Sequence, residues 1–309
     1  MGSLAPILLF VYKRLDTLKQ VVESLKNNFL VEDSVLYLFS DAPKSEEDGS
    51  DVVQVRKFIQ TITGFKEIHI FQSCENKGLA KSIIWGVTEV MKKYDKVIVI
   101  EDDLVTSPNF LTFMNQALDF YQNNPLIISV CGYSVPIKKL NCNDVYFTLR
   151  SSSWGWGTWR NRWIEVDWNV SGYQSFSRDS RAKKQFNKMG SDMTGMLMKQ
   201  MNNKLDSWAI RFCFHQFKNN LFSVHPAVSK VVNKGTGTGA THTFDNRYST
   251  NLDAGCSVEF NFTTDVKLDP DIIRSFIRPY SIPVRCKYKF WSLIRQVKRG
   301  FLSNFSVLK

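Results

Sequence analysis

Three consecutive acids, Glu101, Asp102 and Asp103, end an apolar run in the segment "KVIVIEDDLVTSP". Residues 97–101 have the composition of a strand that is buried on both faces. Adjacent carboxylates repel one another, and at the edge of a core they are costly unless a cation meets them. Oxygen ligands of this kind favour Mg²⁺ or Mn²⁺, and such an ion could bridge two phosphoryl oxygens of a diphosphate.

A plainer interpretation of the triplet stays open. Ser107-Pro108 is a good helix start, so the acids could instead form an exposed turn that leads into a helix. Taken alone, the triplet fits either interpretation.

The elements around the triplet alternate between strands and helices. The sequence predicts strands at 7–12, 35–40, 67–72, 96–101 and 126–132, and helices near 16–28, 51–63, 78–93 and 108–123. This alternation predicts an α/β fold with a parallel sheet covered by helices on both faces. The rhythm is lost after about residue 145, where a polar basic helix is expected near 180–203.

Two other predicted strands also end in polar residues. Arg14 follows the first strand and Asp41 follows the second. Ligands of parallel sheets bind beyond the carboxyl ends of the strands, so we expect Arg14, Asp41 and the triplet along one edge. Asp41 could accept from a base N–H, and Arg14 could meet phosphate or pack on a ring. Taken singly, a turn aspartate and a solvated arginine explain them equally well.

The ordered set of segments resembles the inverting glycosyltransferases of the GT-A fold. It is most similar to the N-acetylglucosaminyltransferases that begin complex N-glycan branches or extend O-mannosyl glycans. "VIVIEDDLVTSPNFLTFM" resembles their strand, DxD-type motif and following helix, while "PILLFVYKR" and "LFSDAPK" resemble their nucleotide-binding strand ends. "SSWGWGTW", "LDSWAIR" and "VVNKGTGTGATH" resemble their acceptor-side, catalytic and late Gly-rich segments. The likeness spans about residues 5–245, and short bacterial chains of this kind resemble polysaccharide or O-antigen glycosyltransferases.

The resemblance implies roles for the residues of the predicted edge. Asp103 would be the direct ligand of Mn²⁺ or Mg²⁺, while Glu101 and Asp102 would hold the sugar and ribose of a UDP-sugar donor. Asp41 would read the uracil edge, and Arg14 would help to hold the nucleotide.

The resemblance also implies that Asp206 is the general base that deprotonates the acceptor hydroxyl. Inverting displacement needs a carboxylate on the face opposite the leaving diphosphate, from outside the nucleotide-binding half. Asp206 comes from outside that half, but it could equally be the N-cap of the helix that follows it.

Other candidate contacts lie in the second half. Trp154 and Trp156 alternate with glycines and could stack on acceptor sugars, although core packing of at least one tryptophan in this segment is the alternative. His242 follows a loop with three glycines that could close over the diphosphate. It could complete the metal shell or touch the phosphates.

The positive charge of the chain is concentrated at its end. The net charge is +11, and the nine basic residues after Asp271 stand without any acid, which leaves +2 for the rest. The apolar face of a helix in this tail is formed by Phe290, Leu293, Ile294, Val297 and Phe301. Such a helix predicts contact with an anionic membrane surface, whereas packing on the main domain is the alternative.

The sequence therefore predicts three parts: a nucleotide-sugar-binding half at 1–133, an acceptor half of the same domain at 134–265, and a basic amphipathic tail at 266–309. Six cysteines without a CxxC pair favour free thiols in a reducing compartment. We expect a cytoplasmic enzyme, peripheral on the inner face of a bacterial-type membrane, with a lipid-linked glycan as acceptor.

Other function classes fit the sequence less well. A sugar-nucleotide nucleotidyltransferase usually carries a Gly-rich basic loop after its first strand, and "VYKRLDTLKQ" has no glycine. A non-enzymatic basic module, for instance one for nucleic acid, fits poorly with a main domain of net charge +2.

Overall fold

The structure is a computed structural model that describes residues 3–137, 143–235 and 246–291. An eight-stranded sheet runs through its centre in the order β3-β2-β1-β4-β8-β6-β9-β7. In chain order these strands are β1 (Ile7–Val11), β2 (Val35–Ser40), β3 (Glu67–Gln72), β4 (Lys96–Glu101), β6 (Ile127–Cys131), β7 (Val145–Thr148), β8 (Trp156–Trp159) and β9 (Phe222–Pro226). A separate two-stranded ribbon joins β5 (Leu104–Thr106) to β10 (Val231–Asn233).

The first four strands form a parallel block. β3 pairs with β2, β2 with β1, and β1 with β4, all in parallel. Both faces of β1, β2 and β4 are covered, whereas the edge strand β3 is partly exposed: Ile7 and Leu9 of β1 lie in one hydrophobic cluster, while Leu8 and Phe10 lie in another. Burial on both faces explains the unbroken apolar runs in the sequence and confirms the predicted α/β class.

Helices form the outer layers of the molecule. The α-helices are α1 (Leu15–Lys26), α2 (Gly49–Ile59), α3 (Leu79–Val90), α4 (Phe110–Tyr121), α5 (Arg160–Trp163), α6 (Tyr173–Arg178), α7 (Ser180–Phe186), α8 (Met193–Met201), α9 (Trp208–Lys218) and α10 (Pro270–Ile277). The 3₁₀ turns are η1 (Glu46–Asp48), η2 (Asn187–Met189), η3 (Asn246–Tyr248) and η4 (Arg278–Tyr280). Helices α1, α2 and α4 pack on one face of the sheet, whereas α3 and α9 pack on the other.

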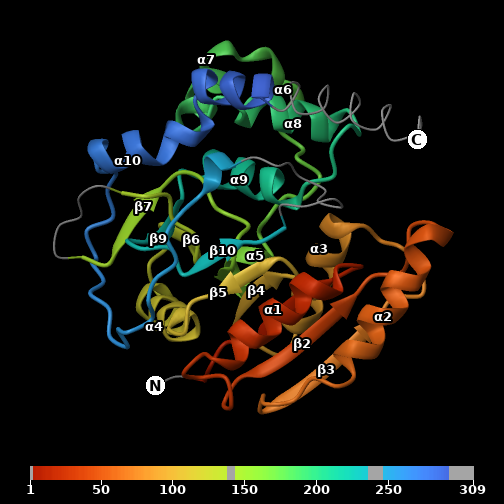
Figure 1. Cartoon of the computed structure of the whole chain (residues 1–309). Helices are drawn as coiled ribbons and strands as arrows, with labels where there is room; N and C mark the ends of the chain where they lie inside the picture. The colour runs from red at the N-terminus through yellow and green to blue at the C-terminus, as the bar shows by residue number, and fades with distance from the viewer. Residues whose placement is uncertain (1–2, 138–142, 236–245, 292–309) are drawn as a thin grey trace, which may run out of the picture.

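The two predicted halves share the central sheet. β8 lies between β4 and β6 and is antiparallel to both. Gly157 permits this insertion, because a Cβ at that position would lie 2.8 Å from the carbonyl oxygen of Val97. In Figure 1 the first half, red to yellow, fills the lower part of the molecule, and the second half, green to blue, lies above it.

The helix predicted near 180–203 is wrong as a single element. The chain instead forms α7, η2 and α8, which pack with α6 and α9 around a small cluster that includes Phe176, Phe186 and Leu197. The break falls at Gly190, whose φ of 150° is not helical.

The last described part of the chain has two different characters. Phe276 and Tyr280 are 1% and 7% exposed and belong to the main core, so the tail predicted at 266–309 begins inside the folded body. Residues 282–291 are helical, and Phe290 and Trp291 there are 60% and 48% exposed. The rest of the predicted apolar face lies outside the described residues. Among the described helices, none has the length and apolar character needed to cross a membrane.

Candidate functional site

The carboxyl ends of β1, β2 and β4 meet at one edge of the sheet. Their register pairs Val11 with Ser40 and Phe10 with Glu101, so the three strands end side by side. The residues that follow them include Arg14, Asp41 and the acidic triplet. The structure thus brings these predicted residues to one edge.

The cation that meets the triplet is Arg14. Its Nη1 donates to Oδ2 of Asp103 at 2.9 Å, and its Nη2 donates to Oδ1 of Asp102. The backbone N–H of Tyr12 donates to the other oxygen of Asp102 at 3.0 Å. One guanidinium therefore bridges two carboxylates that are nearly buried, with Asp102 3% and Asp103 8% exposed.

Arg14 does not balance the whole triplet. Burial raises the pKa of Glu101 to about 8, with the charges of Asp103 and Asp102 adding to the effect. Burial also raises the pKa of Asp102 to about 6, even though Arg14 lowers it. Within the described chain, the Glu101 side chain has no hydrogen bond or ion pair, and the buried Oδ1 of Asp103 has no hydrogen-bond partner. The edge is short of positive charge and of hydrogen-bond donors.

The β5–β10 ribbon covers the triplet. Asn233 is opposite Leu104 in this antiparallel pair, and the backbone N–H of Lys234 donates to the carbonyl oxygen of Asp103 at 2.8 Å. Gly235 follows, and a Cβ there would lie 2.3 Å from Oδ2 of Asp103. The predicted Gly-rich loop thus begins against the triplet. His242 and the rest of that loop lie outside the described residues.

The donor set at this edge suits a hard divalent cation. Among the residues that the structure describes, the candidate ligand atoms are carboxylate oxygens, which Mg²⁺ and Mn²⁺ prefer. Oδ1 of Asp103 is buried without a hydrogen-bond partner, and the carboxylate oxygens of Glu101 have no partner among the described residues. No ready cluster of three or more His, Cys, Asp or Glu ligands exists among the described residues. A cation here would therefore rely on few protein ligands.

Asp41 has the structural role of a turn aspartate, which was the alternative interpretation of its sequence. Oδ1 accepts from the backbone N–H groups of Ala42 and Lys77, both at 2.9 Å, and Oδ2 accepts from that of Gly78 at 2.9 Å. The carboxylate thus ties the end of β2 to the loop that precedes α3. Gly78 has a φ of 74°, which favours glycine, and this left-handed turn in "ENKGLA" is the signal that could have identified the loop.

Asp206 lies across from this loop. A Cβ at Gly78 would be 3.4 Å from Oδ2 of Asp206, so the second half of the chain meets the first at this point. The Asp206 side chain is 55% exposed, and its nearest cation is Arg211 at 3.7 Å. Ser207, and not Asp206, caps α9, because its Oγ accepts from the backbone N–H of Ile210. The alternative role of Asp206 as an N-cap is therefore wrong.

The two candidate stacking tryptophans differ. Trp156 is fully buried in β8 and stacks on Trp208, with ring centroids 4.5 Å apart, and on Trp163 at 5.7 Å. It therefore offers no face to a sugar, and its predicted acceptor contact is wrong. Trp154 is only half-buried and packs edge-on against Tyr133 at 4.6 Å. It remains the candidate of the pair.

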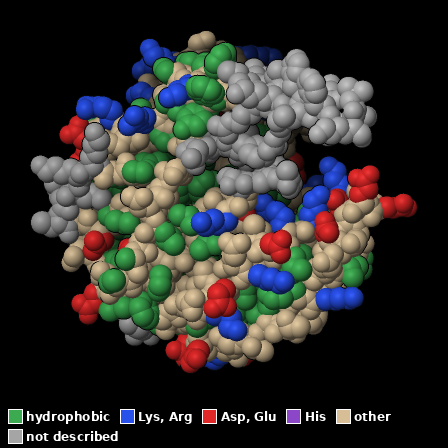
Figure 2. All heavy atoms as spheres, in the orientation of Figure 1, with side chains coloured by type: hydrophobic (Ala, Val, Ile, Leu, Met, Phe, Trp, Pro, Cys, Tyr) green, Lys and Arg blue, Asp and Glu red, His purple; other side chains and the backbone are tan. Residues whose placement is uncertain are grey.

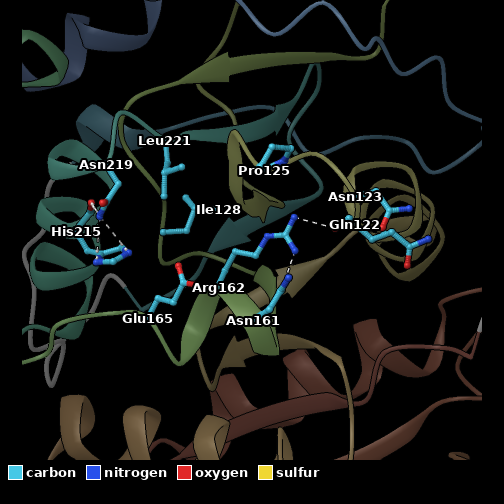
Figure 3. A pocket seen from close by; sticks show the side chains of 10 residues that line it. All are labelled: Gln122, Asn123, Pro125, Ile128, Asn161, Arg162, Glu165, His215, Asn219 and Leu221. Carbon is cyan, nitrogen blue, oxygen red and sulfur yellow. Dashed lines mark hydrogen bonds between the residues drawn. The ribbon is translucent and has the colours of Figure 1, made fainter.

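A hollow of about 500 Å³ opens at the opposite edge of the sheet, near the start of β6 and β9 (Figure 3). It is lined by Gln122, Asn123, Pro125, Ile128, Asn161, Arg162, Glu165, His215, Asn219 and Leu221. Its arginine, Arg162, already donates to the carbonyl oxygens of Gln122 at 2.8 Å and Asn124 at 3.1 Å. None of the predicted site residues lines this hollow, so it is separate from the triplet edge.

Comparisons with known proteins give little additional information. No family model matches the chain, and no curated protein matches it. Among solved structures it is similar to the mannosyltransferase PcManGT from Pyrobaculum calidifontis in complex with GDP-Man and Mn²⁺, with 11% identity and a TM-score of 0.36 over 52% of this chain and 46% of that one. It is also similar to S. aureus TarS, with 12% identity and a TM-score of 0.30 over 44% of this chain and 22% of that one. Both matches span less than half of the solved chain, and similarity of this extent does not assign an activity.

Proposed function

We propose that this chain is a metal-dependent inverting glycosyltransferase that transfers a sugar from a nucleotide-sugar donor to a glycan acceptor. The observation that carries the proposal is the acidic triplet at the shared strand edge, where Asp103 keeps a buried oxygen free. A site that is short of positive charge suits a ligand that brings its own cation. A sugar nucleotide chelated to Mn²⁺ or Mg²⁺ is such a ligand.

Residues of the edge would bind the donor. Asp103 would hold the cation through Oδ1, and Arg14, at the same edge, can pair with phosphate oxygens. Glu101 and Asp102 would face the sugar and ribose, and Asp41 would lie near the base. When bound, the metal would neutralise the charge of the departing diphosphate. We expect His242 to approach the same phosphates from the Gly-rich loop.

Asp206 would act as the general base. Its exposed carboxylate can reach an acceptor hydroxyl, and its position across from Gly78 brings it to the border between the two halves. A base on the acceptor side, away from the metal, suits a single displacement that inverts the anomeric carbon. Trp154 could offer part of its ring to the acceptor sugar.

We further propose that the donor is a UDP-sugar, such as UDP-GlcNAc, and that the acceptor is a lipid-linked glycan of surface polysaccharide synthesis. Exposed Phe290 and Trp291, together with the basic residues after Asp271, would bring the enzyme to the cytoplasmic face of an anionic membrane. On the face drawn in Figure 2, basic and acidic side chains are interspersed, which agrees with a body of low net charge. Phe290→Ser with Trp291→Ser should weaken sedimentation with anionic liposomes, and unchanged sedimentation would exclude this contact.

The experiment that tests the proposed reaction is a screen of UDP-, GDP- and dTDP-sugars with Mn²⁺. We expect free UDP, with the sugar transferred in inverted configuration to an added glycan acceptor or, without one, to water; conversion of the sugar nucleotide and added pyrophosphate to a nucleoside triphosphate and sugar 1-phosphate would favour a nucleotidyltransferase instead. Asp206→Asn keeps the size of the side chain and removes its basicity. Transfer should then fall by about two to four decades while donor binding persists. Full activity in that variant, or retained configuration in the product, would contradict the role of Asp206.

A further inference from the structure

The contact between Arg14 and the triplet bears on how a cation would enter the site. The guanidinium holds Asp102 and Asp103 at once, and only 26% of the Arg14 side chain is exposed. Arginine does not lose its proton in proteins, so Arg14 is a permanent cation inside the site. It already occupies one of the two oxygens of the residue that would bind the metal.

The other oxygen of Asp103 has no partner. Oδ2 accepts from Arg14 at 2.9 Å, while Oδ1 is buried without a hydrogen bond from any described residue. A buried acceptor without a hydrogen-bond donor costs free energy, so a ligand that pairs with this oxygen would stabilise the protein. The Asp103 carboxylate is half paired, and any cation that binds Oδ1 must share the carboxylate with Arg14.

Gly235 lies close to the pair. A Cβ at this position would lie 2.3 Å from Oδ2 of Asp103 and 2.8 Å from Nη1 of Arg14, so there is room for glycine but not for a side chain. While Arg14 holds Oδ2, an incoming cation can take only Oδ1 of Asp103. A full approach of the cation requires that Arg14 move away.

We propose that Arg14 competes with the divalent cation for Asp103, and that the cation binds well only when the donor diphosphate takes Arg14 as its own partner. This inference rests on the proposed function. A diphosphate is a strong bidentate partner for a guanidinium. Binding of the metal and of the nucleotide is then coupled. The diphosphate draws Arg14 away from Asp103, and a cation on Asp103 frees Arg14 to pair with the diphosphate. By linkage, each strengthens the binding of the other by the same factor.

The test compares Mn²⁺ binding, alone and with UDP, in the wild type and two charge-neutralised variants. Arg14→Gln removes the competing cation. Lys13→Gln is the matched control, because Lys13 is the adjacent residue but pairs with Asp48 at 2.5 Å and not with the triplet. Electron paramagnetic resonance measures free Mn²⁺, and calorimetry measures UDP; neither needs turnover.

We expect Mn²⁺ alone to bind Arg14→Gln about tenfold more tightly than wild type, within the usual range of coupling factors. The strengthening of Mn²⁺ binding by UDP should shrink in that variant. Lys13→Gln should behave like the wild type in both respects. Equal or weaker binding of Mn²⁺ alone to Arg14→Gln would overturn the proposal, as would an equal gain in Lys13→Gln, because the effect would then be one of bulk charge.

Two further variants keep the outcome clear. If Arg14→Gln does not fold, Arg14→Lys replaces it: a single ammonium cannot bridge both carboxylates as the guanidinium does, so Mn²⁺ alone should still bind more tightly than to wild type. Wild-type affinity in Arg14→Lys would then contradict the inference. Asp103→Asn separates the two proposals. If it leaves Mn²⁺ and UDP binding unchanged, the proposed function fails; if it abolishes them while Arg14→Gln shows no gain, only the competition fails.

Discussion

Arg14 and Arg150 both pair with carboxylates that are largely shielded from solvent, but they leave different numbers of carboxylate oxygens without a partner. Arg150 forms a two-pronged pair with Asp192, with Nη1 at 2.8 Å from Oδ1 and Nη2 at 3.0 Å from Oδ2, and its guanidinium stacks 3.8 Å from the ring centroid of Tyr280. Both oxygens of Asp192 are thus used. Arg14 divides its donors between Asp102 and Asp103 and leaves one oxygen of Asp103 free.

This difference indicates that the Arg150–Asp192 pair has a structural role, whereas the contact of Arg14 with the triplet belongs to a candidate binding site. The Arg150 pair joins the end of β7 to η2, α8 and η4, and nothing is left for a ligand to satisfy. Both pairs are covered by a glycine: a Cβ at Gly190 would lie 2.2 Å from Nη1 of Arg150, as one at Gly235 would lie 2.8 Å from Nη1 of Arg14. A closely packed glycine is therefore common to both pairs. The feature that distinguishes the triplet edge is Oδ1 of Asp103, which has no hydrogen-bond partner.

The largest expected effect is on the free energy of unfolding when either arginine is replaced by methionine. Arg150→Met should lower the free energy of unfolding by about 3–5 kcal/mol, because it leaves the Asp192 carboxylate, whose side chain is only 12% exposed, without its partner. Arg14→Met leaves Asp102 and Asp103 without their cation and should also lower stability, but Mn²⁺ should restore more stability to it than to Arg150→Met, in which Arg14 still competes with the ion. Chemical denaturation measures both. Arg274→Met is the control: its pair with Asp271 is exposed and should contribute at most about 1 kcal/mol.

If Arg150→Met is no less stable than Arg274→Met, the structural role given to the Arg150–Asp192 pair is contradicted. The comparison of the arginines also breaks if Mn²⁺ stabilises Arg150→Met as much as Arg14→Met, because Arg14 would then not compete with the ion for the triplet.

The two covering glycines should also differ when alanine replaces them. Gly190→Ala places a methyl against Arg150 and Asp192 and should destabilise the fold by about 1–3 kcal/mol through overpacking. Gly235→Ala presses on Arg14 and Asp103 at the open edge, so it should impair UDP binding with Mn²⁺ more than stability. Gly195→Ala is the control, because it meets nothing within 4 Å and lies in α8, where alanine should gain about 0.5–1 kcal/mol. The proposed difference between the two glycines would be contradicted if Gly190→Ala and Gly235→Ala changed stability and Mn²⁺-dependent UDP binding to the same extent.

A smaller effect concerns acid stability. Burial would raise the pKa of Asp192, but the charge and hydrogen bonds of Arg150 outweigh it and hold the pKa below its usual value. A lowered pKa stabilises the fold above the unfolded value of about 4 and loses this contribution as the pH falls through the folded value. The gap in unfolding free energy between the wild type and Asp192→Asn should therefore narrow below about pH 4. A gap that stays constant or widens in acid would contradict this assignment.

Much of the first half could be predicted because its signals are local. Buried parallel strands are continuously apolar, and helices on a sheet show a stripe of apolar residues, so β1 to β4 and α1 to α4 fall within a few residues of their predicted ranges. The edge followed from the same patterns, since strands that run in parallel end together. The triplet was visible because three acids directly follow such a strand.

The remainder depends on contacts between distant parts of the chain. Trp156 is buried because β8 inserts between β4 and β6, and alternation with glycine does not reveal that pairing. The partner of Asp103 is 89 residues away, and the loop that Asp41 holds is 36 to 37 residues away. The break at Gly190 lies against the Arg150–Asp192 pair, whose members are 42 residues apart. Such distances leave no periodic signal.

The central claim is that the triplet edge binds a nucleotide diphosphate together with a divalent cation through Asp103. Calorimetric titration of UDP into the wild type and Asp103→Asn, with Mn²⁺ and with EDTA, tests it most directly. We predict UDP binding to the wild type that EDTA weakens strongly, and no Mn²⁺-dependent binding to Asp103→Asn, although that variant should unfold at a temperature close to that of the wild type. UDP affinity that is unaffected by EDTA, or equal in both proteins, would contradict the claim.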